Sequence, residues 1–308
     1  MEVKVFILLG AARSGTTFLG RSALSKANGV CYLGEPNHIW MHGHAYRRHD
    51  VLGSEDADEA IVSYIRRRFL EKMEVAGANV IIEKTPSNCL RLPFINKVFP
   101  EAKYIHLVRD GRGVVASAAK EWLGAGKDAH DSKELRQGSS LSRVGKGLCA
   151  YMRFRDRISS VRDLLELPSY LPRFGRFVMR NMTSGRDYSW GPRFPGMRSF
   201  RSEHSLYETC AEQWRIQVSS VQDNLHLIDQ DRLYELSFEE LMTSPRTQIG
   251  QLLEWMDVSI EVGKLEAVLS SVQRRTSAGN KDPLSNLNDQ ERKAVEARLQ
   301  PVLSALGY

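Results

Sequence analysis

A short loop near the start of the chain combines glycines, hydroxyl side chains and one arginine in a pattern suited to binding an anion. Residues 10–17 read Gly-Ala-Ala-Arg-Ser-Gly-Thr-Thr, between an apolar run at 3–9 and apolar residues at helical spacing over 16–25. A turn from a buried strand into a helix gathers backbone N–H groups and the positive end of the helix dipole in one small volume. The pattern predicts an anion site formed by Arg13, Ser14, Gly15, Thr16 and Thr17.

This loop differs at one position from the loop of nucleotide triphosphatases, which has the form G-x-x-x-x-G-K-[ST]. Thr16 occupies the position of the lysine that contacts a γ-phosphate, and this weakens an interpretation as an ATPase or a kinase. Arg13 supplies a cation from another point of the loop. We therefore expect the loop to hold a phosphate that carries a leaving group. A tight strand-to-helix turn without a ligand is the alternative.

A second turn of the same kind follows the apolar run at 103–108. Residues 108–117 read Val-Arg-Asp-Gly-Arg-Gly-Val-Val-Ala-Ser. Arg109 and Ser117 are eight residues apart, and we expect both to reach one phosphate, through a guanidinium and a hydroxyl. Ligands of open α/β sheets bind at the carboxyl ends of the strands. Two anion sites at that edge suit a ligand with phosphates at both ends.

The elements that position these loops alternate between strands and helices. This alternation predicts an α/β fold, a P-loop-like parallel sheet flanked by helices, and we expect one domain over residues 1–308. Residues 31–33 are strand-like. Further strands are expected at 79–83, 103–108 and 225–236, and helices at 113–120, 205–221, 237–255 with an interruption near Pro245, and 287–306.

The segment from about 124 to 205 breaks the alternation, and we expect it to be a helical and loop insertion that forms the acceptor side. Net charge is +6 over the chain, and residues 143–201 carry twelve Arg and one Lys against four acidic residues. This excess indicates a polyanion, an anionic cofactor or substrate, or an anionic membrane surface, with a solvated basic face as the alternative. Within it, Trp190-Gly-Pro-Arg193 would present a ring and a guanidinium to an acceptor.

Taken together, the two turns resemble those of the sulfotransferases that use 3′-phosphoadenosine-5′-phosphosulfate (PAPS). Residues 10–17 are similar to the family's 5′-phosphosulfate loop, and 108–117 to its 3′-phosphate motif. Residues 236–241 resemble its segment near the adenine, and 274–281 resemble its basic loop over the 3′-phosphate, with Asn280 where the family has Trp. The resemblance implies cofactor-binding roles for Arg13, Ser14, Gly15, Thr16, Thr17, Arg109, Ser117, Phe238, Arg275 and Ser277.

Within that family the chain is most similar to the tyrosylprotein sulfotransferase-like and bacterial branch, which has an Arg in the loop and a Glu after a Gly. Arg13 and Gly34-Glu35 match this pattern, whereas the cytosolic branch places a His where Pro86 follows Lys84-Thr85. Sulfuryl transfer needs cations at the leaving oxygen and a base for the acceptor's proton. We expect Arg13 and Lys84 to be the cations and Glu35 the base. A capping role for Glu35, or a nearby His as base, is the alternative.

The predicted reaction is in-line transfer of the sulfuryl group from PAPS to a hydroxyl of a glycan, a lipid, a small metabolite or a tyrosine, with 3′-phosphoadenosine-5′-phosphate (PAP) as product. No metal is expected. The chain has a cluster of histidines, His38, His42, His44 and His49, but it lacks a carboxylate or Cys at ligand spacing. The alternatives are a P-loop-like small-molecule kinase and a non-catalytic polyanion- or nucleotide-binding protein.

The bulk properties bear on location. No apolar run approaches the roughly 20 residues of a membrane span, and the start lacks the order of a signal peptide. The four cysteines are far apart in the sequence, without a C-x-x-C pair. We therefore expect a reduced, cytoplasmic protein with peripheral membrane contact through the basic segment 143–201, a hydroxyl-bearing acceptor that is anionic or membrane-associated, and no nucleic-acid partner.

Overall fold

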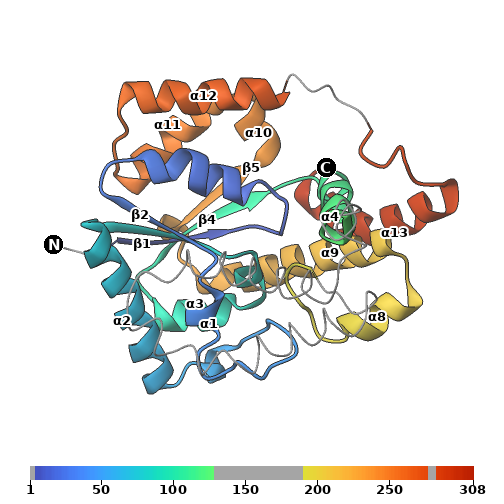
Figure 1. The fold of residues 1–308 in the computed structure, drawn as a ribbon, viewed down its shortest axis with the longest axis horizontal. Coiled ribbons are helices and arrows are strands. Elements are labelled where there is room, and N and C mark those ends of the chain that lie inside the picture. The colour runs from blue at the N-terminus through green and yellow to red at the C-terminus, as the bar shows by residue number, and fades with distance from the viewer. Residues whose placement is uncertain (1–3, 128–189, 277–281) are drawn as a thin grey trace, which may run out of the picture.

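The computed structural model describes residues 4–127, 190–276 and 282–308, with the backbone alone at 124–127 and 274–276. Within these ranges the strands form one parallel sheet, ordered β2-β3-β1-β4-β5 (Figure 1), which confirms the predicted α/β fold. Most of the predicted insertion lies outside the described residues. The strands are β1 (Lys4–Leu9), β2 (Val30–Gly34), β3 (Val80–Lys84), β4 (Lys103–Val108) and β5 (Leu233–Ser237).

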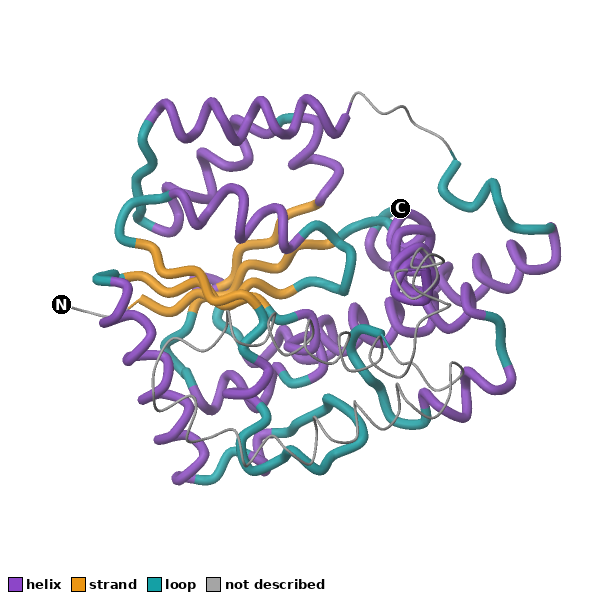
Figure 2. The backbone as a smooth tube through the Cα atoms, in the orientation of Figure 1, coloured by secondary structure: helices purple, strands orange, loops and turns teal. Residues whose placement is uncertain are grey.

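Helices cover both faces of the sheet, as Figure 2 shows. One face is covered by a π-helical and 3₁₀ segment at 18–26 and by α10 (Phe238–Thr243), α11 (Pro245–Met256) and α12 (Val262–Thr276). The other face packs against α1 (Asn37–Trp40), α2 (Glu59–Ala76), α3 (Leu92–Val98) and α9 (Leu206–Asn224). A third group lies beyond the carboxyl ends of the strands and comprises α4 (Gly111–Lys127), α8 (Met197–Glu203), α13 (Asp289–Leu306) and part of α9.

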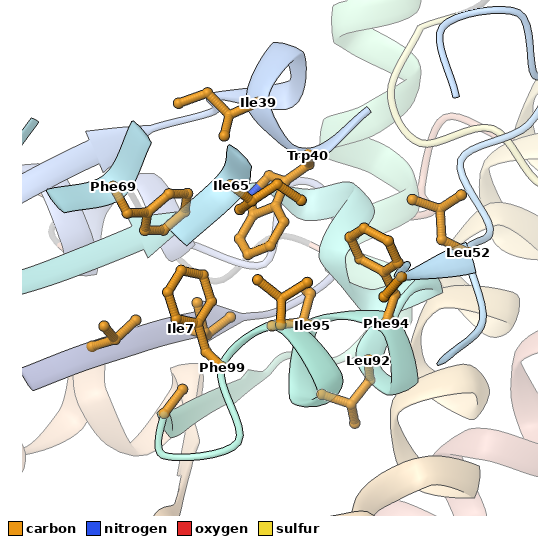
Figure 3. Close-up of a cluster of buried hydrophobic side chains, with 14 of the residues drawn as sticks. Ile7, Ile39, Trp40, Leu52, Ile65, Phe69, Leu92, Phe94, Ile95 and Phe99 are labelled. Carbon is orange, nitrogen blue, oxygen red and sulfur yellow. The ribbon is translucent and has the colours of Figure 1, made fainter. Parts of the chain in front are cut away.

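The core below the sheet is aromatic (Figure 3). Trp40 is fully buried between Phe69, Phe94 and Phe99, with its ring centroid 5.0 Å from that of Phe69 in an edge-on arrangement. Ile7 of the central strand β1 contributes to the same cluster. Edge-to-face aromatic pairs add to the stabilisation that comes from burial of apolar area. This cluster fixes the position of α1, which begins two residues after the candidate base Glu35.

Capping residues account for several helix boundaries. The hydroxyl of Ser205 accepts from the Glu208 amide, and the Glu208 carboxylate accepts from the Ser205 amide, so a capping box begins α9. Asp58 and Asn288 cap α2 and α13 in a similar way. These caps satisfy N–H groups that have no partner inside the helix, which is why the helices begin where they do.

Three local predictions need correction. The strand expected at 225–236 is restricted to β5, and 3₁₀ turns occupy Leu225–Leu227 and Gln230–Arg232. Residues 274–276, predicted as the start of a basic loop, are the last residues of α12. The helix predicted at 113–120 extends to Lys127, past the predicted start of the insertion. Local composition indicates that an element exists more reliably than where it begins and ends, which is why these bounds differ.

The order of the strands places the candidate loops together. β1 lies between β3 and β4, so the loop after β1 is flanked by the ends of both neighbours. After β1 the chain enters the layer with α10 to α12, and after β4 it enters α4 in the third helix group. A change of direction of this kind between adjacent parallel strands opens a crevice at their carboxyl ends, where ligands of such folds bind.

Shortening a fully buried side chain of β1 should destabilise the whole sheet. We expect Ile7→Ala to lower the free energy of unfolding by about 2–5 kcal/mol, because Ile7 is 0% exposed and the cavity cannot collapse. Urea denaturation followed by circular dichroism measures this. The matched control, Val75→Ala on the exposed side of α2, should change it by less than about 0.5 kcal/mol. Equal effects of the two substitutions would contradict the assignment of the core.

Candidate active site

The loop at 10–17 adopts a strained turn around Arg13 and Gly15. Arg13 has φ +74° and Gly15 has φ +100°. A Cβ at Gly15 would lie 2.5 Å from the ring of Phe238, so only glycine allows this close approach. The Ser14 hydroxyl is buried and has no hydrogen-bond partner among the described residues. A positive φ at a non-glycine residue costs free energy and is concentrated at functional sites.

The second turn contacts the first directly. Arg109 donates from Nη1 to the carbonyl oxygen of Arg13 at 3.0 Å, and its guanidinium lies over the ring of Phe238, 4.2 Å from the centroid. Arg13 in turn donates from Nε to the hydroxyl of Ser117 at 3.0 Å. Burial lowers the pKa of Arg109. The structure thus brings together Arg13, Gly15, Arg109, Ser117 and Phe238, which the sequence had assigned to three separate motifs.

A carboxylate–ammonium pair lies at the neighbouring strand ends. Gly34 is in register with Lys84, and the Glu35 amide donates to the Lys84 carbonyl at 2.8 Å. The Lys84 ammonium donates to Glu35 Oε1 at 2.6 Å; the Lys84 side chain is 2% exposed and that of Glu35 is 40% exposed. Glu35 has φ +59°. The Glu35 carboxylate is therefore partly exposed, and it is hydrogen-bonded to the buried ammonium of Lys84.

Glu83, directly before Lys84, is fully buried and holds the turn after β3. It accepts from the Thr85 hydroxyl at 2.5 Å and from the Asn88 amide. Burial raises the pKa of the Glu83 carboxyl to about 7. Arg91, also fully buried, donates to the side-chain oxygen of Asn37 at 2.6 Å. These contacts fix the two backbone segments that carry Glu35 and Lys84.

Sequence reasoning missed two glutamines of α9. Gln217 accepts from the Ala12 amide at 3.1 Å, and Gln213 donates to the carbonyl oxygens of Trp190 and Pro192 at 3.0 and 2.6 Å. Gln217 also donates to the Gln213 carbonyl. Two buried polar residues four positions apart on a helix were the available signal, since such residues need partners. α9 therefore holds the anion loop and residues 190–192 in a fixed relation.

Two other contacts also escaped the sequence. The Arg13 guanidinium pairs with Glu121 of α4 at 3.1 Å. Arg193 pairs with the buried carboxylate of Asp50, Nη2 to Oδ1 at 2.5 Å, and its amide donates to the same carboxylate. The expectation that Arg193 is presented to an acceptor is therefore not supported. Its guanidinium is bound to Asp50 and attaches this segment to the loop that contains Asp50. Trp190 is half-buried.

The remaining predicted residues have varied positions. Thr16 is buried and Thr17 exposed at the start of the helical segment. Arg275 is on the last turn of α12 with a side chain that is not described, and Ser277 lies outside the described residues. His42 stacks on Tyr64. In the described part of the chain no group of three or more His, Cys, Asp or Glu is arranged to hold a metal ion.

Comparison with known proteins agrees with this geometry. A sequence profile of the sulfotransferase family matches residues 5–167, which is more than half of the chain. The chain belongs to the sulfotransferase family. The matched residues of this sulfotransferase include both turns, the loop at 10–17 and the motif at 108–117. Members of the family transfer a sulfuryl group, and the chain is therefore a transferase of that kind.

Solved structures show the same fold. The sulfotransferase domain of the Synechococcus PCC 7002 olefin synthase is 16% identical, with a TM-score of 0.50. The match covers 100% of this chain and 96% of that domain's chain. Sulfotransferase STF9 from Mycobacterium avium is 12% identical, with a TM-score of 0.50, and covers 99% and 77%. At such low identity the likeness concerns the fold alone. No curated protein sequence gives a significant match.

None of the helices in the described part of the chain combines the length and the apolar character that crossing a bilayer requires.

The raised pKa of Glu83 predicts a pH-dependent stability. The folded protein keeps the proton up to about pH 7, whereas the unfolded chain releases it near its ordinary pKa of 4.5. Since the folded state binds the extra proton, the free energy of unfolding should fall as pH rises from 4.5 to 7, by up to about 3 kcal/mol.

We expect Glu83→Gln to remove this part of the pH dependence. Urea denaturation of the wild type and the variant at pH 5 and pH 8 measures it. Glu74→Gln, on the exposed side of α2, controls for the loss of one acidic group. Parallel pH profiles of the wild type and Glu83→Gln would show that burial does not shift the titration of this carboxyl.

Proposed function

We propose that this sulfotransferase takes the sulfuryl group from PAPS and transfers it to a hydroxyl of its acceptor. The observation that carries the proposal is the contact between the two turns. Arg109 and Ser117 of the second turn both hydrogen-bond to Arg13 of the first. This contact supports the proposal, because two turns of this kind that meet at a topological switch point would suit a donor with a 5′-phosphosulfate and a 3′-phosphate.

The residues present fit such a donor. The turn at 10–17, with its glycine packed against Phe238 and its helix start at Thr16, would hold the 5′-phosphosulfate. Arg109 and Ser117 would hold the 3′-phosphate through a guanidinium and a hydroxyl. Phe238, which already packs between Gly15 and Arg109, offers an apolar surface near the base. Arg275 and Ser277 are proposed to contact the 3′-phosphate.

Glu35 and Lys84 supply the chemistry in this proposal. Lys84 binds Oε1 of Glu35 and orients the carboxylate, which then accepts the proton of the acceptor hydroxyl. The acceptor oxygen forms a bond to sulfur while the bond from sulfur to the 5′-phosphate oxygen breaks. Arg13 and Lys84 stabilise the negative charge that develops on that phosphate oxygen. A preorganised cation is worth more here than in water, because it needs no reorganisation during transfer.

Several broader expectations remain proposals. We propose a cytoplasmic enzyme of a single domain whose basic segment, 143–201, binds an anionic or membrane-associated acceptor. Of this segment the structure describes residues 190–201. The other part of the predicted insertion, 128–189, lies outside the described residues.

Binding of PAP tests the donor site directly. We expect isothermal titration calorimetry without Mg²⁺ to show micromolar binding, and Arg109→Ala to weaken it by roughly tenfold to a hundredfold, because a charge-assisted contact is lost. Arg67→Ala is the matched control, since Arg67 lies on the exposed side of α2, away from both turns, and pairs with Glu71 one helical turn along. It should change the PAP affinity by less than about twofold.

Other results of this titration would contradict the proposal. Tighter binding of ATP with Mg²⁺ than of PAP would favour a small-molecule kinase. Absence of PAP binding, together with binding of heparin-like chains that falls steeply with salt, would favour the polyanion-binding alternative.

Substitution of the proposed base should separate catalysis from binding. We expect Glu35→Gln to lower kcat by about a hundredfold or more, because the amide cannot accept the proton, and to leave the PAP affinity within about twofold. Release of PAP from PAPS in the presence of a panel of phenols and sugar alcohols measures turnover. Asp58→Asn, at the distant cap of α2, is a control for loss of a carboxylate. Full activity of Glu35→Gln would exclude Glu35 as the base.

A further inference from the structure

The turn between β4 and α4 is held from outside by Glu239, which lies within the segment 236–241, and by Tyr308, which no sequence motif includes. Glu239, the second residue of α10, accepts from the Asp110 amide at 3.2 Å through Oε1. Its other oxygen, Oε2, accepts from the Tyr308 hydroxyl at 2.6 Å. Tyr308 follows α13, and its amide donates to the Leu303 carbonyl at 3.0 Å. Figure 1 shows this end of α13 beside α4.

These residues surround Arg109, the proposed 3′-phosphate ligand. Asp110 directly follows it, and Glu239 directly follows Phe238, over whose ring the Arg109 guanidinium lies. Burial is the largest influence on Arg109 and lowers its pKa, and the charge of Glu239 acts in the opposite direction. Glu239 hydrogen-bonds to the residue next to Arg109 and directly follows the ring on which this guanidinium lies, so its carboxylate and that of Asp110 can compete with a ligand phosphate for Arg109.

Each of these carboxylates is occupied by another donor. Asp110 pairs with the Arg112 guanidinium at 2.7 Å. Glu239 is held between the Asp110 amide and the Tyr308 hydroxyl. Arg109 meanwhile donates to the carbonyl oxygen of Arg13, a neutral group that a ligand phosphate can replace or supplement. A hydrogen bond to a charged group is stronger than one between neutral groups, so the hydroxyl of Tyr308 is an effective restraint on Glu239.

We propose that Tyr308 and Glu239 are positioning residues that keep the guanidinium of Arg109 available to the 3′-phosphate of the donor. Tyr308 holds the Glu239 carboxylate on the Asp110 amide, and this prevents the carboxylate from pairing with Arg109. The inference rests on the proposed function, since it takes the 3′-phosphate as the ligand of Arg109. It makes Tyr308 a determinant of selectivity for 3′-phosphorylated adenosine nucleotides.

Two conservative substitutions separate this role from simple packing. Tyr308→Phe keeps the ring, which packs against the helix group formed by α4, α9 and α13, and removes only the hydroxyl. Glu239→Gln removes the charge that would compete for Arg109 but keeps a carbonyl oxygen for the Asp110 amide. If Tyr308 acts by restraining a charge, its hydroxyl should matter only when residue 239 is a glutamate.

A double-mutant cycle tests this with the matched nucleotides PAP and adenosine 5′-monophosphate, which differ by the 3′-phosphate alone. Calorimetry on the full chain gives the affinity of the wild type, Tyr308→Phe, Glu239→Gln and the double variant for each. We expect Tyr308→Phe to weaken PAP by about tenfold and to leave adenosine 5′-monophosphate within about twofold. In the Glu239→Gln background, Tyr308→Phe should change neither affinity by more than about twofold.

Opposite outcomes would overturn the inference. If Tyr308→Phe weakens both nucleotides equally, or weakens PAP equally in both backgrounds, Tyr308 serves only to dock α13. Thermal unfolding without ligand identifies any general loss of stability. A failure of the proposed function has a different signature, because the wild type itself would then not bind PAP, or Arg109→Ala would not weaken it.

Discussion

The position of β1 between β3 and β4 is the constraint on which the site depends. Parallel pairing aligns the carboxyl ends of neighbouring strands, so every residue that follows a strand emerges at one edge of the sheet. The loop at 10–17 therefore lies between Lys84 on one side and Arg109 on the other. The register of Gly34 with Lys84 adds Glu35 to the same edge. A shift of one residue in either pairing would turn these side chains to the wrong face.

The electrostatic design of this edge follows from the cost of burying charge. An unpaired buried cation is strongly unfavourable, and removal of one partner of a buried pair leaves that cost uncompensated. Lys84 is buried against Glu35, and Arg13 is paired with Glu121. Arg109 lies on an aromatic ring and donates to a carbonyl oxygen. The cations are thus held in place before any ligand arrives, and the strained backbone at Arg13 and Glu35 is maintained by the contacts around them.

Helix α9 connects the donor side of the site with the segment that follows the basic region. Gln217 holds the anion loop at the Ala12 amide, and Gln213 holds the carbonyl oxygens of Trp190 and Pro192. Because the two glutamines are one helical turn apart and buried, the two segments they hold have a fixed separation. The Asp50–Arg193 pair attaches the same segment a second time. In this way a rigid helix, and not the loops themselves, sets the spacing between the two sides.

The sequence by itself determined the alternation of strands and helices, the two anion-binding turns and the family they resemble, because glycine spacing and apolar periodicity are local properties. It also singled out Glu35 and Lys84, but only through the resemblance. Tertiary structure decided which turns meet, that Arg193 is used by Asp50, and that α9 reaches the loop. It also connected Tyr308 to the second turn through Glu239. These contacts join residues between 69 and 205 positions apart in the sequence. No local pattern records a contact that arises only when separate elements pack together.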